Sequence, residues 1–409
     1  MTTKLSTISL FTGVGGLDYG FEAAGFDTRV ALEMDPTCCD SLRASRHWPV
    51  IEADLLETPT TRILEAGSLS SGCVDMLIGG PPCQPFSKSG WWKSGDSLRL
   101  EDPRADTLSG FLRVLKEAAP CAFLLENVEG LAFGGKDEGL RLLLAAIDRI
   151  NATSGTKYKP VVITLNAADF GVPQTRSRVF VIGSRDGSIF ETPTPTHQDP
   201  ASTCEPPQPW ITAWDAIGGL PTPDEAGLAL SGKWADLLPS IPEGQNYLWH
   251  TDRMDGQPLF GWRRRYWNFL LKLAKNRPAW TIQAQPGPAT GPFHWANRRL
   301  SGEELCRLQT FPNDVLVTGG RIEVQRQVGN AVPSLLAEVL AREIKRQFFG
   351  GTRHRSAPRL MSSRAAHVPP PETPQPVPRK YLHLAGSHAP HPGTGKGFLY
   401  DEAEQISYA

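Results

Sequence analysis

The stretch Thr7–Gly20, "TISLFTGVGGLDYG", decides the fold of this chain. Its short, largely apolar start predicts a buried strand. Glycines at positions 13, 15 and 16 then predict a tight turn, and the residues after them predict the first turns of a helix. A strand that enters a helix through a glycine turn opens a βαβ unit, so the stretch predicts a parallel sheet with a ligand at the end of its first strand.

The same alternation continues through the amino-terminal half. The apolar runs "TRVALE", "VDMLIGG" and "AFLLENV" alternate with the helical patterns "LSGFLRVLKEAA" and "LRLLLAAIDRI". This alternation predicts the α/β class, here a Rossmann-like, mostly parallel sheet with helices on both faces. Ligands of such sheets lie at the carboxyl ends of the strands. The loops that we expect to converge there are Phe11–Gly16, Glu33, Pro81–Cys83 and Glu126–Asn127.

The pattern changes after about residue 185. Eight of the eleven tryptophans fall within residues 186–297, where periodic segments are few, and this predicts a smaller, irregular second domain. Amphipathic patterns return in residues 298–350, which we assign to the same domain as residues 1–185. The tail, residues 351–409, holds nine prolines and five of the nine histidines, which predicts disorder and little contribution to activity. These histidines lack a second ligand cluster, so no metal is predicted.

Composition excludes the extreme classes. The chain carries a net charge of −1 and 21% charged residues, without an apolar run of about 18 residues, so we expect a soluble, cytoplasmic protein. Seven cysteines without metal-ligand spacing are typical of a reducing compartment. The charge is uneven, because Gly256–Arg299 holds eight Lys or Arg and no acidic residue. This segment predicts a basic surface that faces phosphates.

The glycine loop favours one kind of cofactor. Glu33 follows Gly13 by twenty residues and ends the next predicted strand, where a carboxylate can accept hydrogen bonds from ribose hydroxyls. The dinucleotide fingerprint fails, since its third glycine would stand at Asp18. A tight structural turn is the alternative reading. S-adenosylmethionine fits better than a dinucleotide, because it has a ribose but no pyrophosphate.

Four side chains are candidates for chemistry. Cys83 stands among prolines and glycines in "GGPPCQPFS", which holds a nucleophile on a stiff turn, although most cysteines are buried and structural. Glu126 follows four apolar residues, so burial would raise its pKa and keep a proton for donation; a surface glutamate is the alternative. Arg176 and Arg178 are two apart and so share one face of a strand, unless they form an exposed edge pair.

Six motifs in order resemble those of the DNA cytosine-5 methyltransferases. They are "FTGVGG", "GGPPCQPFS", "ENVEGL", "QTRSRVF", "RRLSGEELCRLQTFP" and "QVGNAVP". The resemblance runs from about Leu5 to Phe349 and leaves residues 186–297 variable. It implies an enzyme that methylates carbon-5 of cytosine in double-stranded DNA, of the prokaryotic restriction–modification type. The variable segment would be its target-recognition domain, and a monomer is expected.

The resemblance also implies a mechanism. Cytosine carbon-5 is a poor nucleophile, so Cys83 would first add to carbon-6 while Glu126 protonates ring nitrogen-3. Arg178 would bind the exocyclic oxygen of the base, and Arg176 would support the site near Cys83. The target base cannot be reached inside a duplex, so it would be flipped out of the stack.

Cofactor and DNA residues are carried over by similarity. Asn330 and Val332 are far from the glycine loop in sequence, so the last helix must fold back against the first strand. The residues expected to bind S-adenosylmethionine are Phe11, Gly13, Gly16, Glu33, Met34, Asp54, Leu55, Pro82, Asn330 and Val332. Those expected to bind DNA are Ser87, Lys88, Lys93 and Arg99 in a closing loop, and Arg263, Arg264 and Arg265 in the recognition domain. An RNA cytosine-5 methyltransferase and a DNA-binding repressor without turnover are the alternatives.

Overall fold

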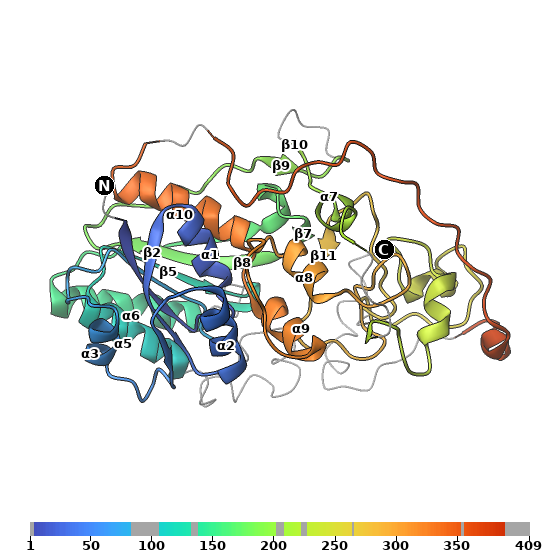
Figure 1. The fold of residues 1–409 in the computed structure, drawn as a ribbon, viewed down its shortest axis with the longest axis horizontal. Helices are drawn as coiled ribbons and strands as arrows, with labels where there is room; N and C mark the ends of the chain where they lie inside the picture. Colours follow the sequence, from blue (N-terminus) through green and yellow to red (C-terminus); the bar gives the residue numbers. More distant parts are fainter. Residues whose placement is uncertain are drawn as a thin grey trace.

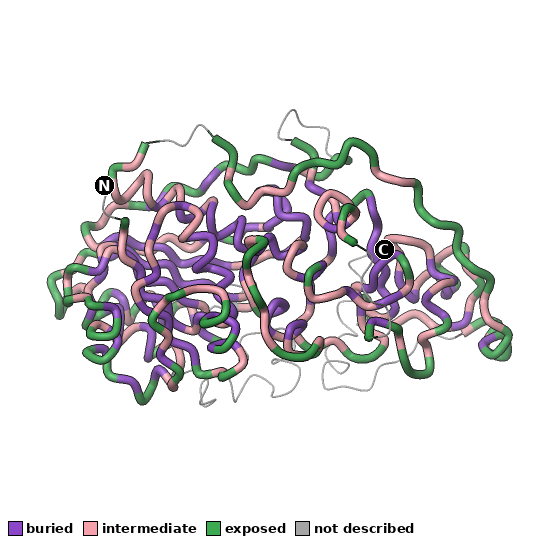
Figure 2. The backbone as a smooth tube through the Cα atoms, in the orientation of Figure 1, coloured by how far each residue is buried: buried purple, intermediate pink, exposed green. Residues whose placement is uncertain are grey.

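The computed structural model describes residues 4–82, 106–131, 138–201, 208–221, 227–263, 266–352 and 356–388. Figure 1 shows two lobes side by side, one a sheet covered by helices and the other largely irregular. We call them the sheet lobe, built around the seven-stranded sheet, and the irregular lobe, residues 227–300. The strands of the sheet lobe are largely buried (Figure 2).

The strand order of the sheet is β3-β2-β1-β4-β5-β8-β6. All neighbouring strands are parallel except β8, which runs antiparallel to both β5 and β6. The prediction of a Rossmann-like, mostly parallel sheet is therefore confirmed. The strands are β1 (Leu5–Leu10), β2 (Phe26–Glu33), β3 (Val50–Glu52), β4 (Met76–Gly79), β5 (Ala122–Asn127), β6 (Val161–Asn166) and β8 (Ser177–Ser184).

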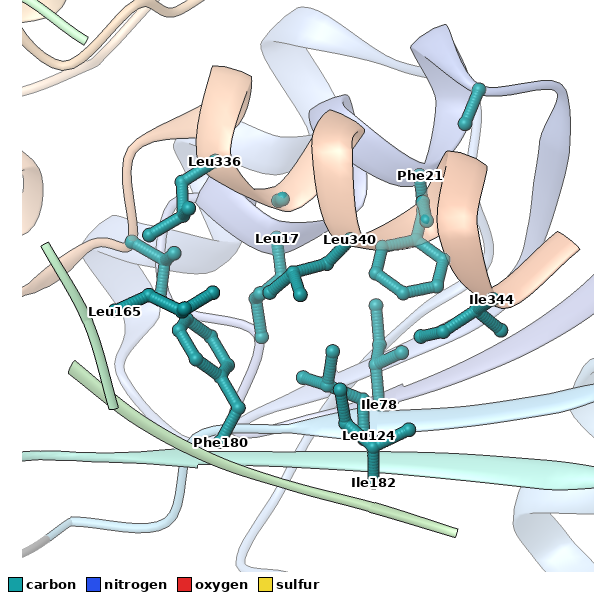
Figure 3. Close-up of a cluster of buried hydrophobic side chains, with 14 of the residues drawn as sticks. Leu17, Phe21, Ile78, Leu124, Leu165, Phe180, Ile182, Leu336, Leu340 and Ile344 are labelled. Carbon is teal, nitrogen blue, oxygen red and sulfur yellow. The ribbon is translucent and has the colours of Figure 1, made fainter. Parts of the chain in front are cut away.

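Helices cover both faces of this sheet. Figure 3 shows one face, where α1 (Gly16–Ala23) and α10 (Ser334–Phe348) pack their leucines and Phe21 onto Ile78, Leu124 and Ile182. The apolar faces of three further helices pack on the opposite face. These are α3 (Thr60–Ala66), α5 (Asp106–Ala118) and α6 (Glu138–Ser154), and α2 (Pro36–Ser45) lies along β2 and β3 at the sheet edge.

The contact between α1 and α10 depends on a glycine. A Cβ atom at Gly20 would lie 2.4 Å from the carbonyl oxygen of Ser334 and 2.5 Å from the Cβ of Ala337. Only glycine allows the two backbones to approach this closely. Farther along, Lys345 Nζ donates a hydrogen bond of 3.1 Å to the carbonyl of Ala24. The last helix therefore folds back on the first, as predicted.

The two lobes are joined by an apolar cluster that draws on both. Leu273, Ile282 and Trp295 pack there with Leu305 and Val328. The irregular lobe has a separate core of its own. A capping box of Ser301 and Glu304 opens α8. The elements of this region are α7 (Ala213–Ile217), α8 (Gly302–Leu308), α9 (Arg321–Asn330), β7 (Gln174–Thr175), β9 (His197–Gln198), β10 (Gln208–Pro209), β11 (Ala279–Trp280), and the 3₁₀ turns Ala235–Ser240 and Tyr247–His250.

The tail differs from the prediction of disorder. Residues 356–388 have defined contacts with both lobes, and Tyr381 is only 3% exposed. A 3₁₀ turn, Arg379–Leu384, carries this tyrosine into the core of the irregular lobe. The low apolar content of the segment predicts disorder. Few apolar residues are needed, however, when a segment docks on an existing core instead of building its own.

Within the described ranges, no helix is long and apolar enough to cross a membrane. In the same residues, His, Cys, Asp and Glu form no group of three that would hold a metal ion.

Candidate active site

Glu33 closes the glycine loop at the end of β1. One carboxylate oxygen accepts the N–H of Gly13 at 2.8 Å, and the other accepts those of Met34 and Asp35 at 2.9 Å each. Gly13 has φ +56°, a left-handed conformation that favours glycine. Burial raises the pKa of Glu33, against the lowering by these three N–H groups. A carboxylate has about four acceptor positions, so Oε2 keeps capacity for a ligand hydroxyl.

The segment that follows α9 packs against the glycine loop and forms a second wall of the site. A Cβ atom at Gly16 would lie 2.4 Å from the carbonyl oxygen of Val332, so the loop and the segment after α9 are in direct contact. Asn330 is exposed beside them. Met34 is 62% exposed at the same rim, which is unusual for a large apolar side chain and leaves it accessible to a ligand.

The remaining predicted cofactor residues lie after the carboxyl ends of the neighbouring strands. Asp54 follows β3, and its carboxylate accepts the N–H of Leu56 at 2.9 Å. Leu55 is 1% exposed, and its side chain packs in the core beneath α5. Phe11 follows β1 with φ +51°, and Pro82 is exposed after β4. The predicted set thus shares one edge of the sheet.

Glu126 and Arg178 form a buried ion pair on adjacent strands. Arg178 Nε lies 2.9 Å from Glu126 Oε1, and the side chains are 14% and 12% exposed. Burial raises the pKa of Glu126, and this outweighs the lowering by Arg178 and Arg176. The pair therefore combines an acid that retains its proton above the ordinary range with a donor for a polar ligand atom.

The loop that leads to Cys83 runs beside Glu126. A Cβ atom at Gly80 would lie 3.0 Å from Glu126 Oε2, and Asn127 Nδ2 donates to the carbonyl of Pro81 at 3.4 Å. Cys83 itself lies outside the described residues, as do Ser87, Lys88, Lys93 and Arg99. The described end of this loop nevertheless starts next to the carboxyl of Glu126.

Arg176 faces the interior and is 2% exposed. Its guanidinium donates to the carbonyls of Ile282 at 3.2 Å and Gly329 at 2.8 Å, and its Nε has no partner among the residues that the structure describes. Arg176 precedes β8, and its side chain thus links the start of this strand to Gly329, the residue before Asn330. This geometry suits support of the site better than contact with a substrate.

Two buried glutamines belong to the same framework, and sequence reasoning missed them. Gln174 donates to Gln309 Oε1 at 3.1 Å and accepts the N–H of Ile282 at 3.0 Å. Gln309 donates to the carbonyls of Val328 at 2.7 Å and Ala331 at 3.3 Å. Both carbonyls lie at the end of α9, where intrahelical donors run out, and that of Val328 also accepts the N–H of Ala331 at 3.3 Å. A signal was present only in "LQTFP", where Gln309 follows Leu308 and precedes Phe311, because the residues after Gln174 in "QTRSRVF" are polar.

The basic segment 256–299 differs from the predicted surface. Lys272, Lys275 and Arg298 are each about 5% exposed or less, so they do not face solvent. Lys275 pairs with Glu243 at 2.6 Å, and burial lowers the pKa of Lys272 to about 8. Arg263 is partly exposed and its guanidinium lies 5.0 Å from the ring centre of Tyr266. Arg264 and Arg265 lie outside the described residues.

Comparison with known proteins identifies the family. The chain is 41% identical over 374 residues to the type II methyltransferase M.SacI of Streptomyces achromogenes, covering 85% of this chain and 94% of that protein. It is 34% identical to M1.HphI of Haemophilus parahaemolyticus, over 83% and 87% of the two chains. A prophage-encoded DNA modification methyltransferase of E. coli shares the fold, with a TM-score of 0.61 at 22% identity, over 84% of this chain and 99% of that one. Residues 5–346 match the C-5 cytosine-specific DNA methylases, and the chain belongs to this family.

Proposed function

We propose that this protein is the modification enzyme of a type II restriction–modification system. It would methylate carbon-5 of one cytosine within a specific duplex sequence and so protect that sequence from cleavage. The observation that carries the proposal is the identity of 41% to a type II methyltransferase over nearly its whole length. The buried pair of Glu126 and Arg178, next to the loop that leads to Cys83, supports the same reaction.

The residues present fit S-adenosylmethionine. Glu33 Oε2 has acceptor capacity left, Met34 offers an exposed apolar side chain, and Asn330 lies at the same rim. When bound, the cofactor supplies a methyl group on a sulfonium centre. Glu33 would hold the ribose hydroxyls, and the glycine loop leaves room for the ligand against the backbone.

Around the base, the chain would perform three tasks. Cys83 adds its thiolate to carbon-6, which makes carbon-5 nucleophilic. Glu126 holds a proton at ring nitrogen-3, because burial favours its protonated form. Arg178 donates to the exocyclic oxygen and so fixes the orientation of the flipped base. After methylation, a base takes the carbon-5 proton, the bond between carbon-6 and sulfur breaks, and Cys83 leaves as a thiolate, which restores the ring.

We propose that the irregular lobe reads the target sequence, with Arg263, Arg264 and Arg265 near the phosphates. Partial exposure of Arg263 supports this role. The burial of Lys272, Lys275 and Arg298 removes them from it.

The proposed function is tested by methyl transfer from tritiated S-adenosylmethionine. We expect label in duplex DNA and none in transfer RNA, and bisulfite sequencing of the DNA should reveal one methylated cytosine in a fixed context. Label in transfer RNA alone would favour the RNA enzyme. Sequence-specific binding without label would favour a repressor.

Replacement of Glu33 by alanine should weaken cofactor binding by about 1–3 kcal/mol, because polar partners in a buried site would lose their acceptor. Isothermal titration calorimetry with S-adenosylmethionine measures this change. Glu52→Ala is the matched control, since Glu52 ends the neighbouring strand β3 and pairs at the surface with exposed Arg43 at 2.8 Å. Equal affinities for the Glu33 and Glu52 variants would remove Glu33 from the ribose role.

A further inference from the structure

Residues 356–388, which we name the brace, join the two lobes by a route separate from their apolar cluster. In Figure 1 this segment passes along the upper edge of both lobes and ends on the irregular lobe. We propose that the brace fixes the orientation of the irregular lobe and thereby positions the DNA-reading surface for methylation. The proposal rests on the proposed role of that lobe in recognition.

The first anchor of the brace is a buried carboxylate on α10. Glu338 is 0% exposed, and its two oxygens accept the N–H groups of Arg359 at 2.7 Å and Leu360 at 2.9 Å. Arg342 pairs with Glu338 at 2.6 Å and donates to the carbonyls of Ser356 and Ala357. Charge-assisted bonds in a buried setting are among the stronger ones. The near end of the brace is therefore attached firmly to the sheet lobe.

Backbone contacts continue along the brace. Arg364 donates to the carbonyls of Pro209 and Trp210, and the N–H of Ala365 donates to Asp215 at 2.7 Å. Farther on, Glu243 of the irregular lobe accepts the N–H of Glu372 at 3.1 Å. The first of these contacts lie in the region that connects the lobes, and the last lies in the irregular lobe.

The far anchor lies inside the core of the irregular lobe. The ring of Tyr381 stacks on Trp234, with ring centres 5.6 Å apart and planes 22° apart. Its hydroxyl donates to the carbonyl of Lys233 at 2.7 Å. Lys380 next to it pairs with Asp236. This tyrosine is a buried member of the core, not a surface contact.

The part of the brace nearest its far anchor is stiff and lies on the irregular lobe. Six of the residues 369–378 are prolines, and proline-rich segments hold an extended conformation of about 3 Å per residue. Lys275 Nζ donates to the carbonyl of Pro370 at 3.4 Å, and the N–H of Gln375 donates to the carbonyl of Pro239 at 3.0 Å. Only the short stretch 361–368 therefore spans the lobes, and the stiff part continues the attachment as far as Tyr381.

The brace attaches the irregular lobe at a second place, away from the apolar cluster. The apolar cluster, with the bonds of Gln174 and Arg176 to Ile282, fixes the near part of the irregular lobe, but the core around Trp234 is a separate cluster. Attachment of Tyr381 in that second core limits the movement of this part of the lobe relative to the sheet lobe. Most molecules of the free protein then already have the lobe orientation that binds DNA. The apparent Kd for DNA is therefore not raised by a small binding-competent fraction. Tyr381 and Glu338 are thus positioning residues for DNA recognition.

The test compares Tyr381→Ala in the full-length chain with wild type. If the competent fraction falls to about a tenth, the Kd for the target duplex should rise about tenfold, while the Kd for S-adenosylmethionine stays within twofold. Discrimination against a duplex with one changed base pair should fall as well. Fluorescence anisotropy measures the DNA affinities, and calorimetry measures the cofactor affinity as a check of the sheet lobe.

Two matched variants separate the role of the ring from general disturbance. Tyr381→Phe keeps the stacking and should bind DNA nearly as wild type does, and Leu382→Ala alters a neighbour that is 42% exposed. A chain that ends after Thr352 should match Tyr381→Ala. DNA affinity and discrimination within twofold of wild type in that shortened chain would overturn the proposal, as would equal loss of cofactor and DNA affinity in Tyr381→Ala. A wild type that fails to methylate duplex DNA would instead refute the proposed function.

Discussion

Serine in place of Cys83 should abolish covalent capture of DNA. Wild-type enzyme with cofactor should form a denaturation-resistant adduct on duplex DNA that carries 5-fluorocytosine at its target. The reason is that fluorine at carbon-5 blocks the elimination that would release the thiol. The serine hydroxyl is protonated near neutral pH and is a poor nucleophile, so turnover should also fall by about 10⁴-fold or more. Gel electrophoresis under denaturing conditions detects the adduct.

The control for this experiment is another free cysteine. Cys73 is exposed in the sheet lobe, and Cys73→Ser should trap DNA as wild type does. The Cys83 variant should still bind DNA and cofactor, because serine has nearly the volume of cysteine. An adduct peptide that maps to a different cysteine would show that the nucleophile is assigned wrongly.

Glutamine in place of Glu126 should slow adduct formation by about 10²–10⁴-fold, the usual contribution of a positioned acid. The amide can still donate a hydrogen bond to ring nitrogen-3 but cannot transfer a full proton. Rapid-quench measurement of adduct formation on 5-fluorocytosine duplexes gives the rate. Glu129→Gln is the matched control, because Glu129 lies three residues later and only partly buried.

The pH dependence gives a second check on Glu126. Burial raises its pKa, so the acid form persists to higher pH than it would in water. The rate in wild type should therefore decline as the pH rises through the pKa of Glu126, where the proton is lost. Glu126→Gln has no such proton and should lack this decline. A decline of the same position and size in both enzymes would assign it to another group.

The sheet was predictable because its signals are local. Each strand and helix of the amino-terminal half has its own periodicity, and the glycine turn at residues 13–16 marks the ligand edge without reference to the rest of the chain. The carboxylates of Glu33 and Glu126 followed from the same reasoning, since both end a predicted strand.

What was missed depends on partners that are distant in sequence. The burial of Lys275 is compensated by Glu243, and the docking of residues 356–388 depends on Glu338 and on the stacking of Tyr381 on Trp234. Amino-acid composition is an average over a segment, so it does not reveal a single residue that contacts a distant partner. The pairing of Gln174 with Gln309 likewise joins residues 135 apart, so neither motif alone reveals it.

The packing of α10 against α1 has a consequence for protein synthesis. Lys345 and Ala24 are 321 residues apart, yet they meet at one end of the packed helix pair whose other end brings Val332 against the glycine loop. A growing chain on the ribosome therefore lacks one side of its cofactor pocket until translation has passed α10. Closing so long a loop costs little more entropy than closing a shorter one, because the cost rises only with the logarithm of length. Methylation should thus begin only after α10 has been made, so a chain that still lacks α10 should not act on DNA.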